Sequence, residues 1–332
     1  MNPDGKRAPR NRTLCLQPEE RERLQARLVT WTWGMSLESL SGRTVLGDCL
    51  EICRGLPDAS FPLIVADPPY NLDKKFGDSN FSRSCAADYE EWLEAWIPEV
   101  ARLLTEDGTL YVCSEWRSSG SVQAACERHL KVRNRITWER EKGRGAAANW
   151  KNCSEDIWFC TKSNRYHFDA EAVRLKRRVL APYREHDGAP RGWSPEGQDG
   201  FRLTAPSNLW NDLTVPFWSM PENTDHPTQK PEKLMAKLIL ASSRPGDLVL
   251  DPFLGSGTTS VVARKLGRRY VGIERELEYC LLAEKRLDLA AQDASIQGYT
   301  DGVFWERNSG SVRKGSRVAG TVPSQLPLEY PA

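Results

Sequence analysis

The chain has 332 residues, of which 39% are hydrophobic and 27% are charged, so it can bury a core and does not have the composition of a disordered protein. No apolar stretch reaches the length of a membrane span, and no apolar signal region follows the polar, basic N-terminus. The formal net charge is only +1, yet residues 131–191 hold 15 Lys and Arg against 8 Asp and Glu, which suits either a polyanion site or a solvated basic surface.

Strands and helices are expected to alternate after a 42-residue N-terminal extension that carries one short helix at 18–31. The expected elements are a strand, turn and helix over 43–56, a buried strand at 61–66, a helix at 88–104, a strand at 106–114, a helix at 118–130 and strands at 133–140 and 156–163. This alternation predicts an α/β fold with a doubly wound, mostly parallel sheet, and residues 43–165 form its first half.

Residues 166–225 break the alternation. They are rich in Arg, Pro, Gly, Trp and Asn and are expected to form a loop-rich insertion. Residues 226–292 restore the pattern with a helix at 226–243, a strand, loop, helix and strand over 247–276, and a last helix. Residues 293–332 are expected to form a weakly structured C-terminal tail.

A glycine-containing loop connects a strand to a helix within 247–276. The strand ends at Asp251, Gly255 and Gly257 follow, and Glu274 ends the next strand. Glycines let a ligand approach the backbone, the helix start offers N–H donors, and an acid at the next strand end commonly accepts ribose hydroxyls. Asp251 would repel a pyrophosphate but suits a cation, which favours S-adenosylmethionine (SAM) over NAD. An ordinary exposed glycine turn is the alternative.

The acceptor motif is Asp67-Pro68-Pro69-Tyr70, which follows the apolar strand at 61–66. The Asp67 carboxylate and the Pro68 carbonyl offer two hydrogen-bond acceptors at the strand end, and Tyr70 offers a flat face. Two acceptors on an exocyclic amino group would free its lone pair to attack a methyl group, while stacking on Tyr70 would contribute roughly 1–3 kcal/mol. The alternative is a surface turn.

Together these motifs resemble the β class of DNA amino-methyltransferases. DPPY at 67–70 precedes FLGSGT at 253–258, and HPTQKP at 226–231 stands just ahead of the glycine loop, as in that class. The resemblance covers about residues 43–290. It implies a circularly permuted, Rossmann-like methyltransferase fold, SAM as cofactor, no metal, and a base turned out of duplex DNA.

The resemblance assigns Asp67, Pro68, Pro69 and Tyr70 to catalysis. Thr228 and Lys230 would hold the methionine end of the cofactor, and Asp48 its adenine, although Gly-Asp is also a common turn. His226 either assists or caps its helix. The full set implied for cofactor binding is Asp48, Asp67, Thr228, Lys230, Asp251, Pro252, Phe253, Gly255, Ser256, Gly257, Thr258 and Glu274.

The insertion at 166–225 then becomes the candidate target-recognition region, and 142–152 a basic loop beside it. The candidate DNA contacts are Arg144, Lys151, Arg177, Arg178, Arg184 and Arg191, although a single exposed arginine is usually only solvated. The class allows a cognate restriction endonuclease and a homodimer as partners, with no residue here arguing for either. A cytoplasmic location on DNA is expected, because the nine cysteines show neither zinc spacing nor a disulfide framework.

Three alternatives stay open. Asp as the first residue of the acceptor motif favours adenine N6, but cytosine N4 is possible. RNA and protein-glutamine methyltransferases share similar motifs, but usually place the cofactor loop first. A non-catalytic nucleotide-binding or DNA-binding module would transfer no methyl group to any DNA. Carbon-5 cytosine methylation is disfavoured, because no cysteine has the Pro-Cys setting that it needs.

Overall fold

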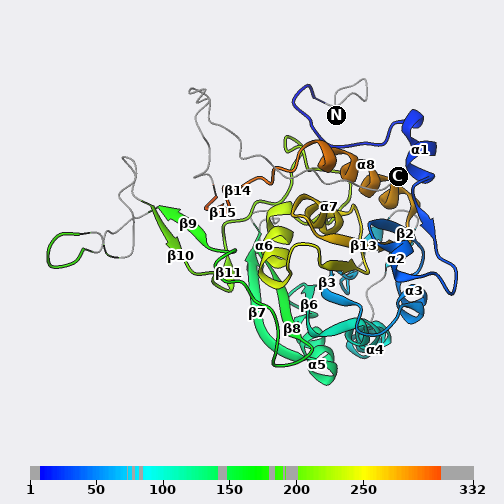
Figure 1. Ribbon diagram of the computed structural model, residues 1–332, viewed down its shortest axis with the longest axis horizontal. Coiled ribbons are helices and arrows are strands. Elements are labelled where there is room, and N and C mark those ends of the chain that lie inside the picture. Colours follow the sequence, from blue (N-terminus) through cyan, green and yellow to red (C-terminus); the bar gives the residue numbers. More distant parts are fainter. Residues whose placement is uncertain are drawn as a thin grey trace.

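The computed structural model describes residues 8–72, 74–76, 79–81, 85–140, 148–178, 184–189, 191 and 201–307. A nine-stranded sheet in the order β1-β2-β13-β12-β3-β6-β8-β7-β11 forms the centre (Figure 1). Its strands are β1 (Val29–Thr30), β2 (Arg43–Leu46), β3 (Phe61–Ala66), β6 (Leu104–Ser114), β7 (Lys131–Glu139), β8 (Ser154–Thr161), β11 (Leu209–Trp210), β12 (Leu248–Asp251) and β13 (Arg269–Glu274). Neighbouring strands are parallel except at β8, which is antiparallel to both β6 and β7.

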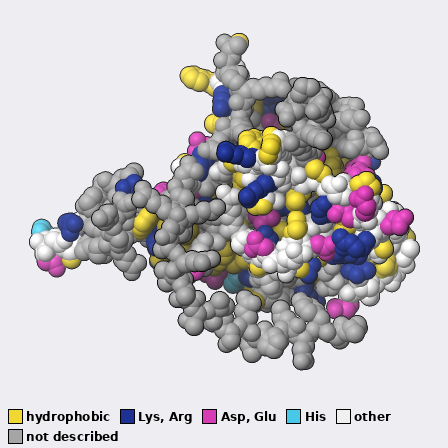
Figure 2. Space-filling view, turned by 90° about the horizontal axis from the view of Figure 1, so that it is seen from above, with side chains coloured by type: hydrophobic (Ala, Val, Ile, Leu, Met, Phe, Trp, Pro, Cys, Tyr) yellow, Lys and Arg dark blue, Asp and Glu magenta, His cyan; other side chains and the backbone are white. Residues whose placement is uncertain are grey.

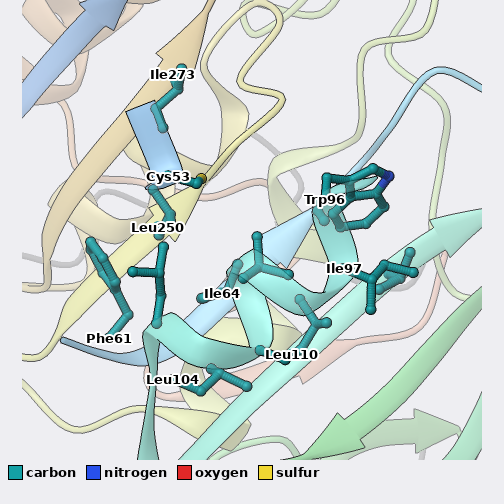
Figure 3. Packing of buried hydrophobic residues seen from close by; sticks show 14 of the residues in the cluster. Cys53, Phe61, Ile64, Trp96, Ile97, Leu104, Leu110, Leu250 and Ile273 are labelled. Atoms are coloured by element: carbon teal, nitrogen blue, oxygen red, sulfur yellow. The ribbon is translucent and has the colours of Figure 1, made fainter. Parts of the chain in front are cut away.

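Helices cover both faces of this sheet, which confirms the predicted doubly wound fold. One face carries α3 (Cys49–Gly55), α4 (Ala86–Leu103) and α5 (Ser119–His129), and the other carries α6 (Glu232–Ser242), α7 (Thr258–Lys265) and α8 (Leu277–Gln292). Successive strand residues point to opposite faces, so Ile64 joins the first core and Leu63 the second. Figure 3 shows the first core, where Trp96 and Ile97 of α4 lie beside Ile64 and Leu110.

The order of the strands reverses between β3 and β12, which pair side by side through Leu63 and Val249. The chain leaves β3 through α4 toward β6 on one side, and leaves β12 through α7 toward β13 on the other side. Because the two connections cover opposite faces, a crevice opens at the carboxyl ends of β3 and β12. The acceptor motif and the glycine loop follow these two strands, so the fold brings the two motifs together.

The N-terminal extension differs from the expectation. The predicted helix at 18–31 is η1 (Pro18–Glu20) followed by α1 (Arg21–Gln25), and it ends early because Val29 and Trp31 are buried against the sheet. Val29 and Thr30 form β1, an edge strand parallel to β2. A further short helix, α2 (Leu37–Leu40), leads into β2.

The insertion and the C-terminal segment are more ordered than expected. Within 166–225, β9 (Leu175–Arg178) pairs with β10 (Phe201–Thr204) in an arm that extends from the body (Figure 1), and β11 joins the main sheet. Within the expected tail, β14 (Tyr299–Thr300) and β15 (Val303–Trp305) extend the sheet of this arm, because β15 pairs with β9 and Phe304 is fully buried.

Two smaller features complete the described elements. A hairpin of β4 (Lys74–Phe76) and β5 (Ser79–Phe81) follows the acceptor motif, and α6 begins at Glu232 rather than at 226. None of the helices in the described ranges combines the length and apolar composition that a bilayer crossing requires.

Candidate active site

A cavity of about 450 Å³ lies where the strand order reverses. Both motifs contribute to its wall, so Asp67 and Gly255 share one crevice. Of the residues predicted for catalysis or cofactor binding, those lining the cavity are Asp48, Asp67, Pro68, Pro69, Tyr70, Thr228, Lys230, Asp251, Pro252, Phe253, Gly255, Ser256, Thr258 and Glu274. Gly257 is absent from the lining.

The acceptor motif sits at the tip of β3, where Pro68 cannot extend the strand ladder because it has no N–H group. The Tyr70 hydroxyl lies 3.0 Å from Asp67 Oδ1 and 3.2 Å from Glu155 Oε2, so it can donate to either carboxylate. Burial, with these two negative charges, raises the pKa of Tyr70 well above its ordinary value and keeps it protonated. The Tyr89 hydroxyl donates to the Pro69 carbonyl at 3.3 Å and holds the turn in place.

Lys230 lies in the same group of side chains. Its Nζ is 2.6 Å from both oxygens of Asp67 and 3.5 Å from Glu155 Oε2. Burial lowers the pKa of Lys230, but the carboxylates of Asp67 and Glu155 together outweigh burial and raise it, so the ammonium stays charged. The resemblance predicts that Lys230 holds the methionine end of the cofactor, whereas here its ammonium contacts the acceptor motif.

The glycine loop is bent where its sequence allows it. Gly255 has φ +53°, and its N–H donates to Glu274 Oε2 at 2.8 Å, so Glu274 both braces the loop and lines the cavity. Burial raises the pKa of Glu274. A Cβ on Gly257, which has φ +85°, would lie 2.6 Å from the Ala283 Cβ. Gly257 therefore lets the loop pack against α8 rather than facing the cavity.

A buried arginine holds the loop from behind. Arg286 of α8, with 2% of its surface exposed, donates to the Ser256 carbonyl at 3.0 Å and to Thr258 Oγ1 at 2.9 Å. Its other nitrogen pairs with Glu232 at the start of α6 at 3.0 Å. These bonds tie α6, α8 and the start of α7 together, and so fix the shape of one cavity wall.

Asp251 ends β12 with 3% of its surface exposed, and its Oδ1 accepts the Phe253 N–H at 3.0 Å. Burial, with the charges of Asp67 and Glu274 adding to it, raises the pKa of Asp251 to about 7. Carboxyl groups outnumber cations in the cavity lining, which favours a cationic ligand: Asp48, Asp67, Asp251, Glu274 and Glu276 against Lys230 and Arg275. SAM carries a sulfonium and an ammonium group, so the charge of this cavity fits the cofactor that the resemblance implies.

The apolar part of the cavity comes from aromatic side chains. Phe253 packs edge-on against Trp96, with ring centres 5.0 Å apart, and lies 6.1 Å from Trp92. Both tryptophans were expected in the core from their helical spacing; Trp96 is buried there, and both also line the cavity. The flat surface beside the glycine loop suits an adenine ring.

Two predicted residues have additional structural roles. The Asp48 carboxylate caps α3 by accepting from the backbone N–H groups of Leu50 at 2.9 Å and Glu51 at 3.3 Å, while it lines the cavity. His226 does not cap α6, because that helix begins at Glu232 with Pro231 as its N-cap. The sequence-based capping alternative for His226 is therefore wrong.

His226 instead stands beside the glycine loop. Its ring lies 4.5 Å from the Tyr279 ring, and a Cβ on Gly255 would come within 3.0 Å of its Nε2. The positive φ of Gly255 and this close approach together favour a residue without a side chain at position 255.

Sequence reasoning missed Arg275 and Glu276, which line the cavity, and three charged residues behind its wall: Glu155, Arg140 and Arg286. Glu155 and Arg286 carry a weak signal, since Glu155 is the second residue of the apolar strand 154–161 and Arg286 lies on the apolar side of the helix 277–292. Arg140 follows β7 and pairs with Glu155, which no spacing in the sequence indicates.

The candidate DNA contacts lie on two segments. Lys151 is exposed on the loop between β7 and β8, at the same edge of the sheet as Asp67. On the arm, Arg177 lies 3.4 Å from Glu306, Arg184 donates to the Gly188 carbonyl, and Arg191 lies 3.4 Å from Glu185. Arg178 is exposed at the end of β9, and Arg144 lies outside the described residues.

Acidic side chains accompany the basic ones on this arm. Residues 184–189 stand at its tip, at the left of Figure 2, where dark blue, magenta and cyan side chains lie together. The arm therefore mixes charges, and a simple basic patch does not describe it.

Comparison with solved structures identifies the fold. The chain has a TM-score of 0.56 against the PvuII DNA methyltransferase, which is cytosine-N4-specific, at 18% identity over 81% of this chain and 94% of the other. It has a TM-score of 0.50 against the complex of M1.HpyAVI with SAM, at 26% identity over 74% of this chain and 98% of the other. The architecture is thus that of the Rossmann-like methyltransferases.

Sequence comparisons identify the family to which the chain belongs. The family model described as DNA methylase matches residues 61–285. The DNA adenine methyltransferase YhdJ of Escherichia coli (strain K12) is 32% identical over 287 residues, which cover 84% of this chain and 93% of the relative. The type II methyltransferase M.HpaI of Haemophilus parainfluenzae is 31% identical over 253 residues, 74% of each chain. The chain belongs to the DNA amino-methyltransferases, the family that methylates adenine N6 or cytosine N4.

Proposed function

We propose that this enzyme methylates the N6 amino group of adenine at a specific site in duplex DNA. The observation that carries the proposal is the shared cavity, which joins the acceptor motif of β3 to the glycine loop of β12. Two points support adenine over cytosine. The acceptor motif begins with Asp67, as adenine enzymes of the family prefer, and the E. coli relative is a DNA adenine methyltransferase.

The cofactor is S-adenosylmethionine, which supplies a sulfonium-bound methyl group when it is bound. We assign its recognition to the glycine-loop side of the cavity. Glu274 would accept from the ribose hydroxyls, Asp251 would take the ammonium group, and Phe253 would cover the adenine ring. Asp48 and Thr228 line the same cavity and complete the proposed set.

The base is held on the other side of the cavity. An amino nitrogen inside a duplex cannot reach a buried methyl donor, so the target nucleotide must leave the stack. Tyr70 would stack on the base, and the Asp67 carboxylate and the Pro68 carbonyl would accept from its amino group. The two acceptors draw the amino hydrogens out of the plane of the base. The nitrogen lone pair is then no longer delocalised into the ring and can attack the methyl group directly.

DNA is proposed to run along the edge of the sheet at which β3 ends. Lys151 and the arm residues Arg177, Arg178, Arg184 and Arg191 are the proposed phosphate or base contacts. A restriction endonuclease of the same specificity is a proposed partner, since relatives such as M.HpaI are type II methyltransferases.

The test is to identify the modified base in DNA from a host that expresses the chain. Sequencing that detects modified bases, with mass spectrometry of the nucleosides, should find N6-methyladenine in one recurring motif. The signal should vanish with Asp67→Ala and persist with Asp88→Ala, an exposed acid at the start of α4. N4-methylcytosine would refute the choice of adenine, and a host without any new modification would refute the activity.

A further inference from the structure

Four charged side chains meet beside the acceptor motif, and two of them come from segments outside the family motifs. Glu155 lies near the start of β8, which begins at the edge where β3 ends because β8 runs antiparallel to β6. Its Oε2 lies 3.2 Å from the Tyr70 hydroxyl and 3.5 Å from Lys230 Nζ, while its Oε1 pairs with Arg140. Asp67 completes the group through Lys230.

The group is balanced in charge, and two of its four members are buried while Asp67 and Arg140 are partly exposed. Glu155 and Lys230 each have 5% of their surface exposed, so neither charge is well solvated. Two carboxylates, Asp67 and Glu155, face two cations, Lys230 and Arg140. Removing one charge from such a set leaves another without a counterion, which is costly in a low-dielectric site.

In this arrangement Lys230 competes with the base for Asp67. Asp67 has to accept a hydrogen bond from the amino group of the base, yet both of its oxygens lie 2.6 Å from Lys230 Nζ. Together with the Tyr70 hydroxyl on Oδ1, the ammonium takes about three of the roughly four acceptor positions of this carboxylate, so it competes with the amino group for them. A second carboxylate is available to it, because Glu155 Oε2 lies 3.5 Å from the same nitrogen.

We propose that Glu155 is a positioning residue, which takes over the Lys230 ammonium when the base enters and so frees an oxygen of Asp67 for the amino group. The inference rests on the proposed methyl transfer to an amino group, but not on which base carries it. It also moves Lys230 from the cofactor side of the cavity to the base side. Glu155 holds Tyr70 as well, so it orients both the stacking ring and the acceptor.

Variants that change the net charge of the group distinguish this role from a packing role of Glu155. Glu155→Gln keeps the shape and an acceptor for Tyr70, but it leaves the group with one excess positive charge and holds Lys230 on Asp67. Lys230→Met leaves one excess negative charge. The double variant restores neutrality and removes the competitor for Asp67, so its effects should not be additive.

The experiment uses the full chain and a duplex that carries the methylated site found in the host. Single-turnover methyl transfer should fall about 100-fold in Glu155→Gln, because a misplaced acceptor costs a factor of that order. The double variant with Lys230→Met should transfer methyl at least about tenfold faster than Glu155→Gln alone. Glu139→Gln, which removes an exposed carboxylate at the end of neighbouring β7, is the matched control and should keep the wild-type rate.

Binding measurements give the readout that does not depend on turnover. The Kd of SAM should change by less than about threefold in Glu155→Gln and in Lys230→Met, a difference below 1 kcal/mol. The proposal is overturned if Glu155→Gln transfers methyl at the wild-type rate, if the double variant is no faster than Glu155→Gln, or if Lys230→Met loses SAM affinity. Transfer to cytosine instead of adenine would overturn the base assignment above and leave this result intact.

Discussion

The buried carboxyl group of Asp251 allows a quantitative prediction. Its pKa of about 7 lies well above the ordinary value near 4, because burial favours the neutral form. At about 1.36 kcal/mol per pKa unit, ionising this group in the folded protein costs up to ~4 kcal/mol. Between about pH 4 and pH 7 the folded chain keeps a proton that the unfolded chain releases, so the free energy of unfolding falls as the pH rises through that window.

The substitution Asp251→Asn removes this titration and keeps an oxygen that can accept the Phe253 N–H. The variant should therefore gain stability relative to the wild type as the pH rises from about 4 to about 8, by at most ~4 kcal/mol. Chemical denaturation at several pH values measures the difference. Equal pH dependence of the free energy of unfolding in both proteins would refute the assignment of the raised pKa to Asp251.

The affinity for SAM should increase as the pH rises, whereas the free energy of unfolding of the wild type should fall. An ammonium group beside Asp251 favours the carboxylate, so SAM competes with a proton below pH 7 and wild-type binding should tighten up to tenfold per pH unit from about pH 5.5 to about pH 7. Asp251→Asn should bind SAM roughly 10- to 100-fold more weakly at pH 8 and lose that dependence. Calorimetric Kd values that match the wild type at every pH would contradict the proposed contact.

Three further outcomes follow from residues in the cavity wall and directly behind it. Gly257→Ala should destabilise the protein by at least ~2 kcal/mol more than Gly246→Ala, because both positions have positive φ but only Gly257 lacks room for a Cβ. Denaturation measures both, and equal losses would contradict the packing role. Arg286→Met should cost ~1–3 kcal/mol of stability, since the Ser256 carbonyl and Glu232 Oε1 lose a buried donor while Lys265 still pairs with Glu232 Oε2. A loss under about 1 kcal/mol would show that the network is dispensable. Tyr70→Phe should slow methyl transfer by about tenfold or less, while Tyr70→Ala also loses roughly 1–3 kcal/mol of stacking; equal rates would refute stacking.

The sequence predicted those parts of the fold whose signals are local. The apolar strand at 61–66 and the strand, loop and helix over 247–265 were expected, because uninterrupted apolar runs and glycines at a turn depend on few distant contacts. Their adjacency was expected because ligands bind at the carboxyl edge of such a sheet and because the three motifs resemble the β class. The structure adds the reason, since β3 and β12 pair at the point where the strand order reverses.

Tertiary contacts decided what the sequence did not predict. Residues 29–30 leave the expected helix to form β1 because the sheet offers an edge and buries Val29. Residues 299–305 pair with an insertion that stands far away in the sequence, so their weak pattern gave no sign of β14 and β15.

The charges around Asp67 were hidden for the same reason. Lys230 was expected at the methionine end of the cofactor, since HPTQKP alone does not show which acid its ammonium meets. The position of Glu155 depends on the register of β8 against β6. This register pairs Asp156 with Ser114 and so places the adjacent Glu155 beside the acceptor motif. No spacing in the sequence encodes that register.

The central claim is that the Asp67 carboxylate holds the amino group of the base during methyl transfer. Single-turnover methyl transfer by Asp67→Ala, measured beside the SAM affinity of the same protein, tests whether its carboxylate holds the amino group. Transfer should fall at least about 100-fold while the Kd of SAM changes by less than about threefold. Retained SAM binding with a rate only a few fold below the wild type would contradict it.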